Sequence, residues 1–334
     1  MRITRFDLAD EGVVRACFDV HVAAQAVDDP IEPPLSLPAF RHWVTQGWNC
    51  NPCEVWVAAD EATGETVGFC RIELPEPENR DHAHGGPVVR PADRRRGVGS
   101  ALLRHAVERA RANGRSRFGG EPLVDSAGDA FARQTGAKAG LVEARRVLDL
   151  GKVPPGRFAR LRAEAAEKAA GYTLVSWAGP TPEEHLGRVA AAFNAMNDAP
   201  HEPEREDNVW DAERVRERAD APVRTGVLRG YSVAAIAGTD GELAGLTQVF
   251  VDPEIPDFGF QGVTAVPRPH RGHRLGLLTK AAMLEWLAEA EPKLERIATG
   301  NAASNSHMIA VNETLGYELA GPGWQSYYLQ VEPA

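Results

Sequence analysis

Two stretches of the chain share one pattern and decide the fold: VVRPADRRRGVGS at residues 88–100 and AVPRPHRGHRLGL at residues 265–277. In each, a short apolar segment typical of a strand leads into a turn rich in Arg and Gly, and a long helix-like segment follows. Arg94 of the first copy and Arg271 of the second lie 177 residues apart. A period of this length is far too long for a solenoid, so it predicts two tandem domains of one fold.

The turn at the start of each long helix is a candidate pyrophosphate site. The first backbone N–H groups of a helix have no partner within the helix, and the helix dipole adds partial positive charge there. Glycines let the backbone approach a ligand closely, and flanking arginines supply mobile positive charge. The sequence contains neither G-x-x-x-x-G-K-[ST] nor G-x-G-x-x-G after a strand, which argues against a nucleoside triphosphatase and a dinucleotide-binding domain.

The elements around the turns follow the same order in both halves. In the first half we expect strands within 1–7, 54–74 and 82–91 and helices at 12–26, 38–47 and 94–114. In the second half we expect strands within 172–179, 231–251 and 260–266 and helices at 181–196, 209–220 and 271–291. A hairpin turn is expected at Thr239-Asp240-Gly241, and Thr181 and Pro182 predict a helix start.

A boundary follows the first half, where two prolines precede a charged, Ala-rich segment that ends at Gly171. We therefore expect a first domain at residues 1–150, a linker helix at 151–170 and a second domain at 171–334.

Both halves resemble the GNAT superfamily of acyl-CoA N-acyltransferases, whose pyrophosphate loop reads Q/R-x-x-G-x-G/A. Residues 94–99 match this loop fully, whereas in residues 271–276 Arg274 replaces the middle glycine. The resemblance implies a mixed α/β (α+β) fold with two tandem GNAT domains, each a mostly antiparallel splayed sheet flanked by helices. The paired layout is similar to that of the tandem acetyltransferases of actinobacteria, a group that includes mycothiol synthase.

The resemblance also implies acetyl-CoA as the acyl-donor cosubstrate. In the family, the strand before the turn binds the pantetheine arm through backbone groups, and the turn binds the pyrophosphate. The segment 301–317 resembles the family's N-x-x-S/A-N…E-x-L-G-F/Y segment, of which the first half has only a worn version at 131–137. The residues expected to bind acetyl-CoA are Val89, Arg94, Arg95, Arg96, Gly97, Val98, Gly99, Ser100, Thr264, Ala265, Val266, Arg271, Gly272, His273, Arg274, Leu275, Gly276, Asn301 and Asn305.

Direct acyl transfer needs a base for the acceptor ammonium and an acid for the leaving thiolate. The family's usual acid is a Tyr, and the resemblance places Asn312 there in the second half and Ala132 in the first. An Asn can hydrogen-bond coenzyme A but cannot act as an acid at neutral pH. Tyr317, at the family's aromatic core position, is a nearby alternative acid. The base candidates are His84, because a histidine titrates near neutrality, and Asp257, which precedes the equivalent strand of the second half.

The two copies differ in what they retain. The first half has the better pyrophosphate loop and the second the better pantetheine-side segment, so by family analogy we expect the second half to be catalytic. The first would then be a degenerate partner that binds coenzyme A or only builds the interface. The loop His201–Asp207 could line an acceptor site, although such a charged run is more often a solvated loop. Alternatives are a non-catalytic acyl-CoA-binding scaffold and acetylation of a cysteinyl amine.

Composition and net charge indicate which classes of binding partner to expect. The 334 residues carry a net charge of −10, from 47 acidic and 37 basic residues, which argues against a general nucleic-acid binder and favours a cationic small-molecule amine as acceptor. No run of 18 apolar residues and no early apolar stretch suited to a secretory signal is present, so we expect no membrane segment and a cytoplasmic monomer or homodimer. Cys50 and Cys53 form a CxxC without a second ligand pair, so no metal is expected.

Overall fold

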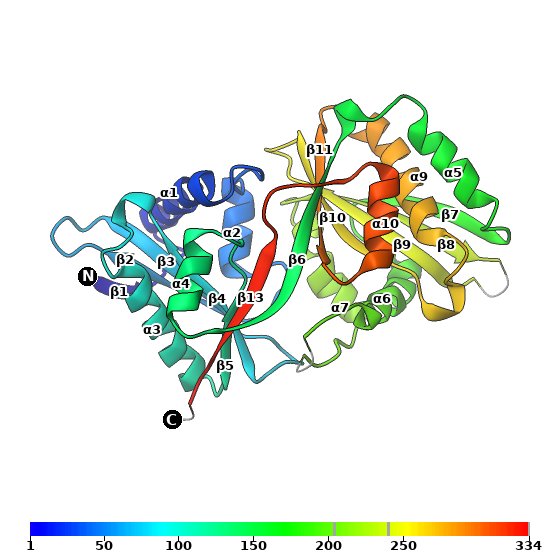
Figure 1. Ribbon diagram of the computed structural model, residues 1–334. Helices are drawn as coiled ribbons and strands as arrows, with labels where there is room; N and C mark the ends of the chain where they lie inside the picture. The colour runs from blue at the N-terminus through cyan, green and yellow to red at the C-terminus, as the bar shows by residue number, and fades with distance from the viewer. Residues whose placement is uncertain (203–204, 239–240, 333–334) are drawn as a thin grey trace. The chain divides into compact units, whose positions relative to one another are not determined.

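The computed structural model describes residues 1–202, 205–238 and 241–332, which form two compact units. The first unit contains Met1–Val142 and the C-terminal segment that begins at Pro322, and the second contains Glu143–Gly321. Each unit is a sheet with helices packed against it (Figure 1). The expected hairpin residues Thr239 and Asp240 lie outside the described residues.

The first unit is built on a sheet of strand order β1-β2-β3-β4-β5-β13, followed by the start of β6. Its strands are β1 (Arg2–Arg5), β2 (Cys53–Ala59), β3 (Thr66–Glu73), β4 (His82–Val89), β5 (Arg117–Gly120), β6 (Lys138–Asp149) and β13 (Trp324–Gln330). Its helices are α1 (Glu11–Asp28), α2 (Leu37–Thr45), α3 (Val98–Ala112) and α4 (Ala127–Gln134). The strands β1 to β4 are antiparallel, but β4 runs parallel to β5 and pairs with it only through His84, so the sheet opens from Gly85 onward.

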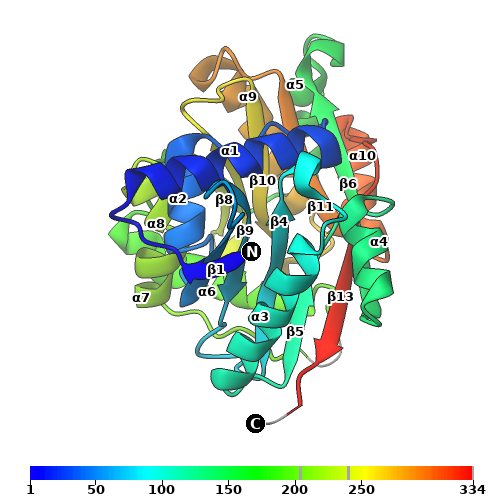
Figure 2. The same cartoon turned by 90° about the vertical axis from the view of Figure 1, so that its left-hand side faces the viewer.

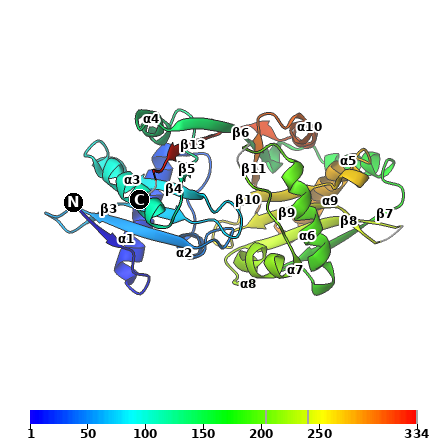
Figure 3. The ribbon, with the colours of Figure 1, turned by 90° about the horizontal axis from the view of Figure 1, so that it is seen from below.

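Helices cover both faces of this sheet because each presents an apolar side. In α3 the buried residues recur every four positions from Val98 to Ala110, and they pack with Ile72 of β3. Helices α1 and α2 pack on Phe69 of the same strand, whose side chain points to the opposite face. Figure 3 shows α1 and α3 on opposite sides of β3.

The second unit repeats this plan, with strand order β6-β11-β10-β9-β8-β7 and β12 paired with β6. Its own strands are β7 (Tyr172–Ala178), β8 (Arg229–Ala237), β9 (Leu243–Val251), β10 (Phe258–Ala265), β11 (Arg296–Ala302) and β12 (Glu318–Leu319). Its helices are α5 (Arg157–Ala166), α6 (Leu186–Asn194), α7 (Ala212–Arg214), α8 (Ala221–Arg224), α9 (Leu275–Ala290) and α10 (Ser306–Leu315). As in the first unit, the central pair β10 and β11 is parallel and pairs only through Phe258–Phe260.

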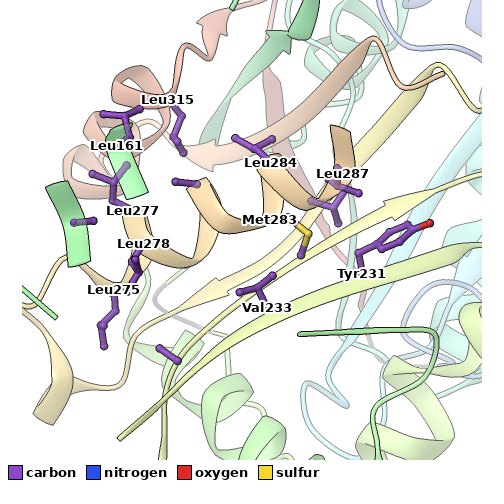
Figure 4. Close-up of a cluster of buried hydrophobic side chains, with 14 of the residues drawn as sticks. Leu161, Tyr231, Val233, Leu275, Leu277, Leu278, Met283, Leu284, Leu287 and Leu315 are labelled. Carbon is purple, nitrogen blue, oxygen red and sulfur yellow. The ribbon is translucent and has the colours of Figure 1, made fainter. Parts of the chain in front are cut away.

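The core of the second unit gathers around α9, which is apolar on nearly every side (Figure 4). Leu161 of α5, Val233 of β8 and Leu315 of α10 all pack into this cluster. Helix α5 lies inside the segment 151–170 that we expected as a linker, and its buried Leu161 and Ala165 make it part of the second unit's core.

The two units exchange their last strands. Residues 143–149 of β6 pair with β11 and β12, so the end of a first-half strand completes the second unit's sheet. In turn β13, the last strand of the chain, pairs with β5 in the first unit, as Figure 2 shows. The unit boundaries therefore fall at 142/143 and 321/322 rather than at 150 and 170, because hydrogen bonding between strands distant in sequence decides where these residues belong.

The fold class, with two splayed sheets of one kind flanked by helices, is confirmed. The helix expected to start at Thr181 and Pro182 begins with a 3₁₀ turn at Glu183–His185, which leads directly into α6 at Leu186. The Thr181 amide and hydroxyl both donate to the Asp220 carboxylate. None of the described helices is long and apolar enough to cross a membrane. The described residues hold no group of three or more His, Cys, Asp or Glu side chains suited to a metal ion.

Candidate functional site

The turn before α3 leaves a row of backbone donors open. Arg95 and Gly97 have left-handed φ values of 63° and 83°, and α3 begins at the next residue. No described side chain caps this helix, and Ala101 donates the first helical hydrogen bond, to the Gly97 carbonyl. The N–H groups of residues 98–100 are therefore available to an anion, which the helix dipole also attracts.

The turn before α9 has the same shape built from different residues. Gly272 and Arg274 are left-handed, with φ values of 88° and 56°, and α9 begins at Leu275 without a side-chain cap from the described residues. Glycine and arginine have thus exchanged the two left-handed positions between the turns. Arg274 adopts the conformation of the missing glycine, at a steric cost of roughly 1 kcal/mol.

The first arginine of each turn is a structural clamp. Arg94 Nε donates to the Val89 carbonyl at 3.2 Å, and its guanidinium binds Asp28 at the end of α1 through bonds of 2.7 and 2.6 Å. Arg271 likewise donates to the Val266 carbonyl at 3.1 Å and to the Asp198 carboxylate at 2.7 Å. These contacts hold each turn to the preceding strand.

The expectation of mobile positive charge was therefore wrong for Arg94 and Arg271, whose guanidiniums are engaged by carboxylates. It was wrong for Arg96 too, which pairs with Asp93 at 2.6 Å and Asp60 at 3.0 Å. The exposed Arg95 and Arg274 make no hydrogen bond or ion pair within the described part of the chain. They are the turn arginines whose charge is open to a ligand.

Several other predicted contact residues point inward. Val98, Ala265 and Leu275 are buried, so they can offer a ligand backbone groups only. The Thr264 hydroxyl bonds the Thr247 hydroxyl at 2.8 Å. The ring of His273 lies 3.2 Å from the Lys168 carbonyl.

Two cavities flank the turn of the first unit. A cavity of about 390 Å³ lies between α3 and α4, lined by Ser100, Leu103, Arg104, Val107, Phe131 and Thr135 among others. A second, of about 310 Å³, lies between Arg94, the end of α1 and the start of α4.

The two units differ in how open the helix start is. The Phe131 ring lies over Gly99, where an added Cβ would meet it at 3.8 Å. At the equivalent Gly276, an added Cβ would meet only the Val266 side chain, at 4.0 Å. The backbone of the second unit is thus the more open to a ligand at this point.

The strand β10 carries a bulge where it diverges from β11. Gln261 pairs with Val249 of β9, but the next pair joins Thr264 to Thr247, so three steps on β10 match two on β9. Such a bulge leaves backbone groups without ladder partners. Gly262 lies inside it against the Phe250 ring, which an added Cβ would meet at 2.5 Å. In the first unit, the pairing of β4 with β3 runs through without a shift.

The asparagines of the second unit lie at the start and along the inner side of α10. Asn305 caps the helix by accepting the Met308 N–H at 3.2 Å. The fully buried Asn312 donates to Asn301 of β11 at 2.8 Å. Its Oδ1 is buried without a hydrogen-bond partner among the described residues, so a ligand donor could still bind there.

Beside them lies a buried lysine that sequence reasoning missed. Lys280 of α9 is 2% exposed, donates to Gln261 Oε1 at 2.8 Å and lies 4.8 Å from the Tyr317 ring centre. Burial lowers the pKa of Lys280 to about 7. The lysine was visible in the sequence as the one charge in the segment 275–284, which is apolar apart from Thr279 and Lys280, but nothing local showed which side it faces.

Tyr317 belongs to the core. It is 2% exposed, its hydroxyl has no partner among the described residues, and burial raises its pKa far above the usual value. A phenol with a raised pKa is a weaker acid, which argues against the role of proton donor that we considered for it.

The two base candidates lie in different units. His84 is the last residue of β4 that pairs with β5, and it lies opposite Glu73 of β3, at the point where the first sheet opens. Asp257 precedes the paired end of β10, with its carboxylate 4.0 Å from Arg296. It is about 23 Å along the strand from Thr264, at 3.3 Å per residue. Within the second unit, Asp257 therefore lies at the other end of β10 from the bulge.

The expected acceptor loop is described only in part. His201 lies 3.8 Å from the Asp207 carboxylate. Pro203 and Glu204 lie outside the described residues.

Comparisons with known proteins agree with this geometry. Residues 51–136 match the acetyltransferase (GNAT) domain. A mycothiol acetyltransferase from Mycolicibacterium paratuberculosis (strain ATCC BAA-968 / K-10) is 26% identical over 246 residues, which cover 73% of this chain and 69% of that protein. The structure of a tandem GNAT protein from the clavulanic acid biosynthesis pathway superposes with a TM-score of 0.82 at 28% identity, over 100% of this chain and 99% of that one.

A GCN5-related N-acetyltransferase from Sphaerobacter thermophilus has the same fold, with a TM-score of 0.67 at 16% identity over 100% of this chain and 96% of that one. The resemblance inferred from the two turns is therefore confirmed: residues 51–136 match the GNAT acetyltransferase domain, and most of the chain is similar to a mycothiol acetyltransferase and to a tandem GNAT protein.

Proposed function

We propose that the protein transfers the acetyl group of acetyl-CoA to the amine of a small molecule, and that the second unit carries the reaction. The observation that carries this proposal is the bulge at Gln261–Thr264 of β10. It lies where β10 and β11 diverge and on the strand that leads into the turn 271–276. The first unit has the turn and the divergence but no shift in β4.

The residues of the second unit fit each part of the donor. The open N–H groups at the start of α9 and the exposed Arg274 suit a pyrophosphate. Gly276 lets that group approach the backbone. The divergent strands offer backbone groups to the pantetheine amides, and the unpartnered Oδ1 of Asn312 is a further acceptor.

The bulge gives this unit a means of polarising a thioester. Backbone N–H groups released from the ladder can donate to the carbonyl oxygen as it becomes an oxyanion, and such donors contribute roughly 10²–10³ in rate each. Fixing the amine beside the carbonyl carbon contributes several kcal/mol more. Polarisation and positioning therefore do not require the tyrosine that Asn312 replaces.

For the first unit we propose binding of acetyl-CoA without turnover. Support comes from Gly97 and the open N–H groups of residues 98–100, and from the cavity of about 390 Å³ between α3 and α4. A ligand at this helix start would also contact the Phe131 ring, which lies within van der Waals distance of a Cβ added at Gly99.

The acceptor is proposed on two grounds. The net charge of −10 favours a cationic amine. The mycothiol acetyltransferase relative suggests a cysteinyl amine as one member of the panel to be tried.

The test is a calorimetric titration with acetyl-CoA, combined with an assay of thiol release on a panel of amines. Gly276→Val blocks the second turn and Gly99→Val is its matched control in the first. We expect two sites in the natural protein, one in each variant, and loss of thiol release in Gly276→Val alone. Loss of release only in Gly99→Val would move the reaction to the first unit. Binding without release for every amine would favour the acyl-CoA-binding scaffold instead.

A further inference from the structure

The reaction proposed for the second unit lacks a proton donor for its leaving group. When the amine displaces coenzyme A, the sulfur departs with the electron pair of the C–S bond and needs a proton. Asn312 stands at the position of the family's tyrosine and cannot supply one. The Tyr317 phenol holds its proton too tightly, because its burial raises the pKa.

Lys280 lies at the point where the thioester would react. Its Nζ donates to Gln261 at 2.8 Å, and Gln261 is the first residue of β10 beyond the last pair with β11. Gln261 is also the residue at which the bulge begins. If the bulge N–H groups hold the carbonyl oxygen of the thioester, the sulfur bonded to the same carbonyl carbon would lie near the Gln261 side chain and the Lys280 amine that it binds.

The Lys280 ammonium has one more N–H group than its contacts with Gln261 and Tyr317 use. An ammonium carries three N–H groups. The Gln261 oxygen accepts one, and the Tyr317 ring face lies beside a second. The third has no hydrogen-bond partner among the described residues. Gln261 itself is fixed, since its Nε2 donates to the Thr247 hydroxyl at 3.0 Å and to the Gln248 carbonyl at 2.5 Å.

Three acidic groups on the elements packed around this amine have other partners. Glu285 of α9 is paired with Arg162 of α5, and Glu313 of α10 with Arg146 of β6. Glu291, just beyond α9, binds Arg229 and Tyr231. Burial is the one cause of the low pKa of Lys280, about 7 against an ordinary 10.5, so the ammonium gives up its proton far more readily than an exposed lysine.

We propose that Lys280 of the second unit donates a proton to the coenzyme A thiolate as it leaves. The C–N bond forms as the C–S bond breaks, the sulfur keeps the electron pair, and one proton passes from Lys280 Nζ to sulfur. The acceptor ammonium gives up two protons on becoming an amide: one restores Lys280, and the other passes to solvent. This role rests on the proposed function of the second unit.

The test compares coenzyme A with desulfo-coenzyme A, which lacks the thiol. All binding is measured in the Gly99→Val variant, so that only the second unit is loaded. We expect the thiol of bound coenzyme A, followed by its thiolate absorbance, to ionise at lower pH than the free thiol. Lys280→Met should abolish this shift, weaken coenzyme A about tenfold at alkaline pH and leave desulfo-coenzyme A unchanged. Lys293→Met, an exposed lysine of the same unit, is the matched control.

Kinetics supply a second readout. With the best amine of the panel, Lys280→Met should lower kcat at least tenfold, keep the KM for acetyl-CoA and remove the alkaline limb of the pH profile. Tyr317→Phe should keep that limb. The proposal is overturned if bound coenzyme A ionises like the free thiol, a result that needs no variant to fold, or if Tyr317→Phe rather than Lys280→Met loses the alkaline limb. Failure of acetyl-CoA to bind the Gly99→Val variant would instead remove the second unit's proposed function.

Discussion

The two units of this protein are alike at their turns and unlike where their sheets open. Both turns have two left-handed residues two positions apart, and both are clamped by an arginine to the strand carbonyl and to a carboxylate from an early helix. Where the sheets open, by contrast, the second unit has a bulge and Lys280. The first unit has regular strand pairing there, and Leu103 occupies the position equivalent to Lys280, 177 residues earlier in the sequence.

The comparison shows that the backbone path of the turn and the side chains near the sheet opening vary independently. A turn keeps its backbone path even when glycine and arginine exchange places, because the conformation and the clamp are preserved. A buried lysine does not arise from the backbone path, and the first unit has Leu103 at the equivalent position, so we propose that the two units have different roles. The predictions that follow test this contrast from its largest expected effect to its smallest.

The largest effect is expected at the bulge. Gly262→Ala places a Cβ against the Phe250 ring and should displace the bulge, with a loss of turnover of roughly 10²–10³, the usual effect of losing an oxyanion donor. The matched change in the first unit is Gly86→Ala in β4, where an added Cβ meets nothing within 4 Å. That variant should keep the natural rate within about twofold. Steady-state thiol release measures both, and equal rates for the two variants would contradict the contrast.

The next effect concerns stability and its dependence on pH. Because the folded pKa of Lys280 is about 7 and its ordinary value is 10.5, the unfolded chain binds more protons between these pH values. The resulting penalty is full below pH 7 and fades as pH rises toward 10.5. Lys280→Met should therefore stabilise the second unit by up to about 5 kcal/mol near neutrality, at roughly 1.4 kcal/mol per pKa unit, and by much less at pH 10.

Urea unfolding at several pH values measures this difference, and Leu103→Met in the first unit is the matched control, with no expected pH dependence. A gain of the same size at every pH would show that packing, not the buried charge, sets the cost.

The sequence predicted the turns and the order of elements because both depend on local patterns. The Arg and Gly spacing at 94–99 and 271–276 sets a backbone path within a few residues. The exchange of β6 and β13 had no such signal, since the pairing of residues 143–149 with 296–302 joins segments about 150 positions apart. The carboxylate partners Asp28 and Asp198 were missed for the same reason.

The site was less predictable than the fold. A bulge depends on how two strands pair, and the hairpin-like segment 231–251 does not reveal it. The family resemblance places Asn312 at the position of a tyrosine, but its buried bond to Asn301 depends on the packing of α10 against β11. The burial of Lys280 could be recognised only from the three-dimensional arrangement, because a lysine on a helix is ordinarily a solvated residue.

A smaller effect is expected at the clamps. Asp28→Asn and Asp198→Asn each remove one carboxylate charge beside a turn arginine, and each should cost about 1 kcal/mol or less, because both pairs are partly exposed. Arg268 and Arg271 hold the pKa of Asp198 below its usual value, so this contribution is present above the ordinary aspartate pKa and is lost as the pH falls. Thermal unfolding at low and high salt measures it, and an effect that salt does not weaken would argue against an ionic clamp.

The smallest effect tests the exchange of glycine and arginine itself. Arg274→Gly removes a side chain from a left-handed position and should stabilise the second unit by about 0.5 kcal/mol, since relief of the strain is partly offset by the freedom that glycine gives the unfolded chain. Gly97→Ala in the first unit should do the opposite and cost about 1 kcal/mol. Arg274→Gly also removes an exposed charge, so acetyl-CoA affinity should fall at most about fivefold if the backbone N–H groups bind the pyrophosphate. A loss of binding as complete as that expected for Gly276→Val would show instead that the arginine side chain, and not the shape it shares with Gly97, holds the ligand in this unit.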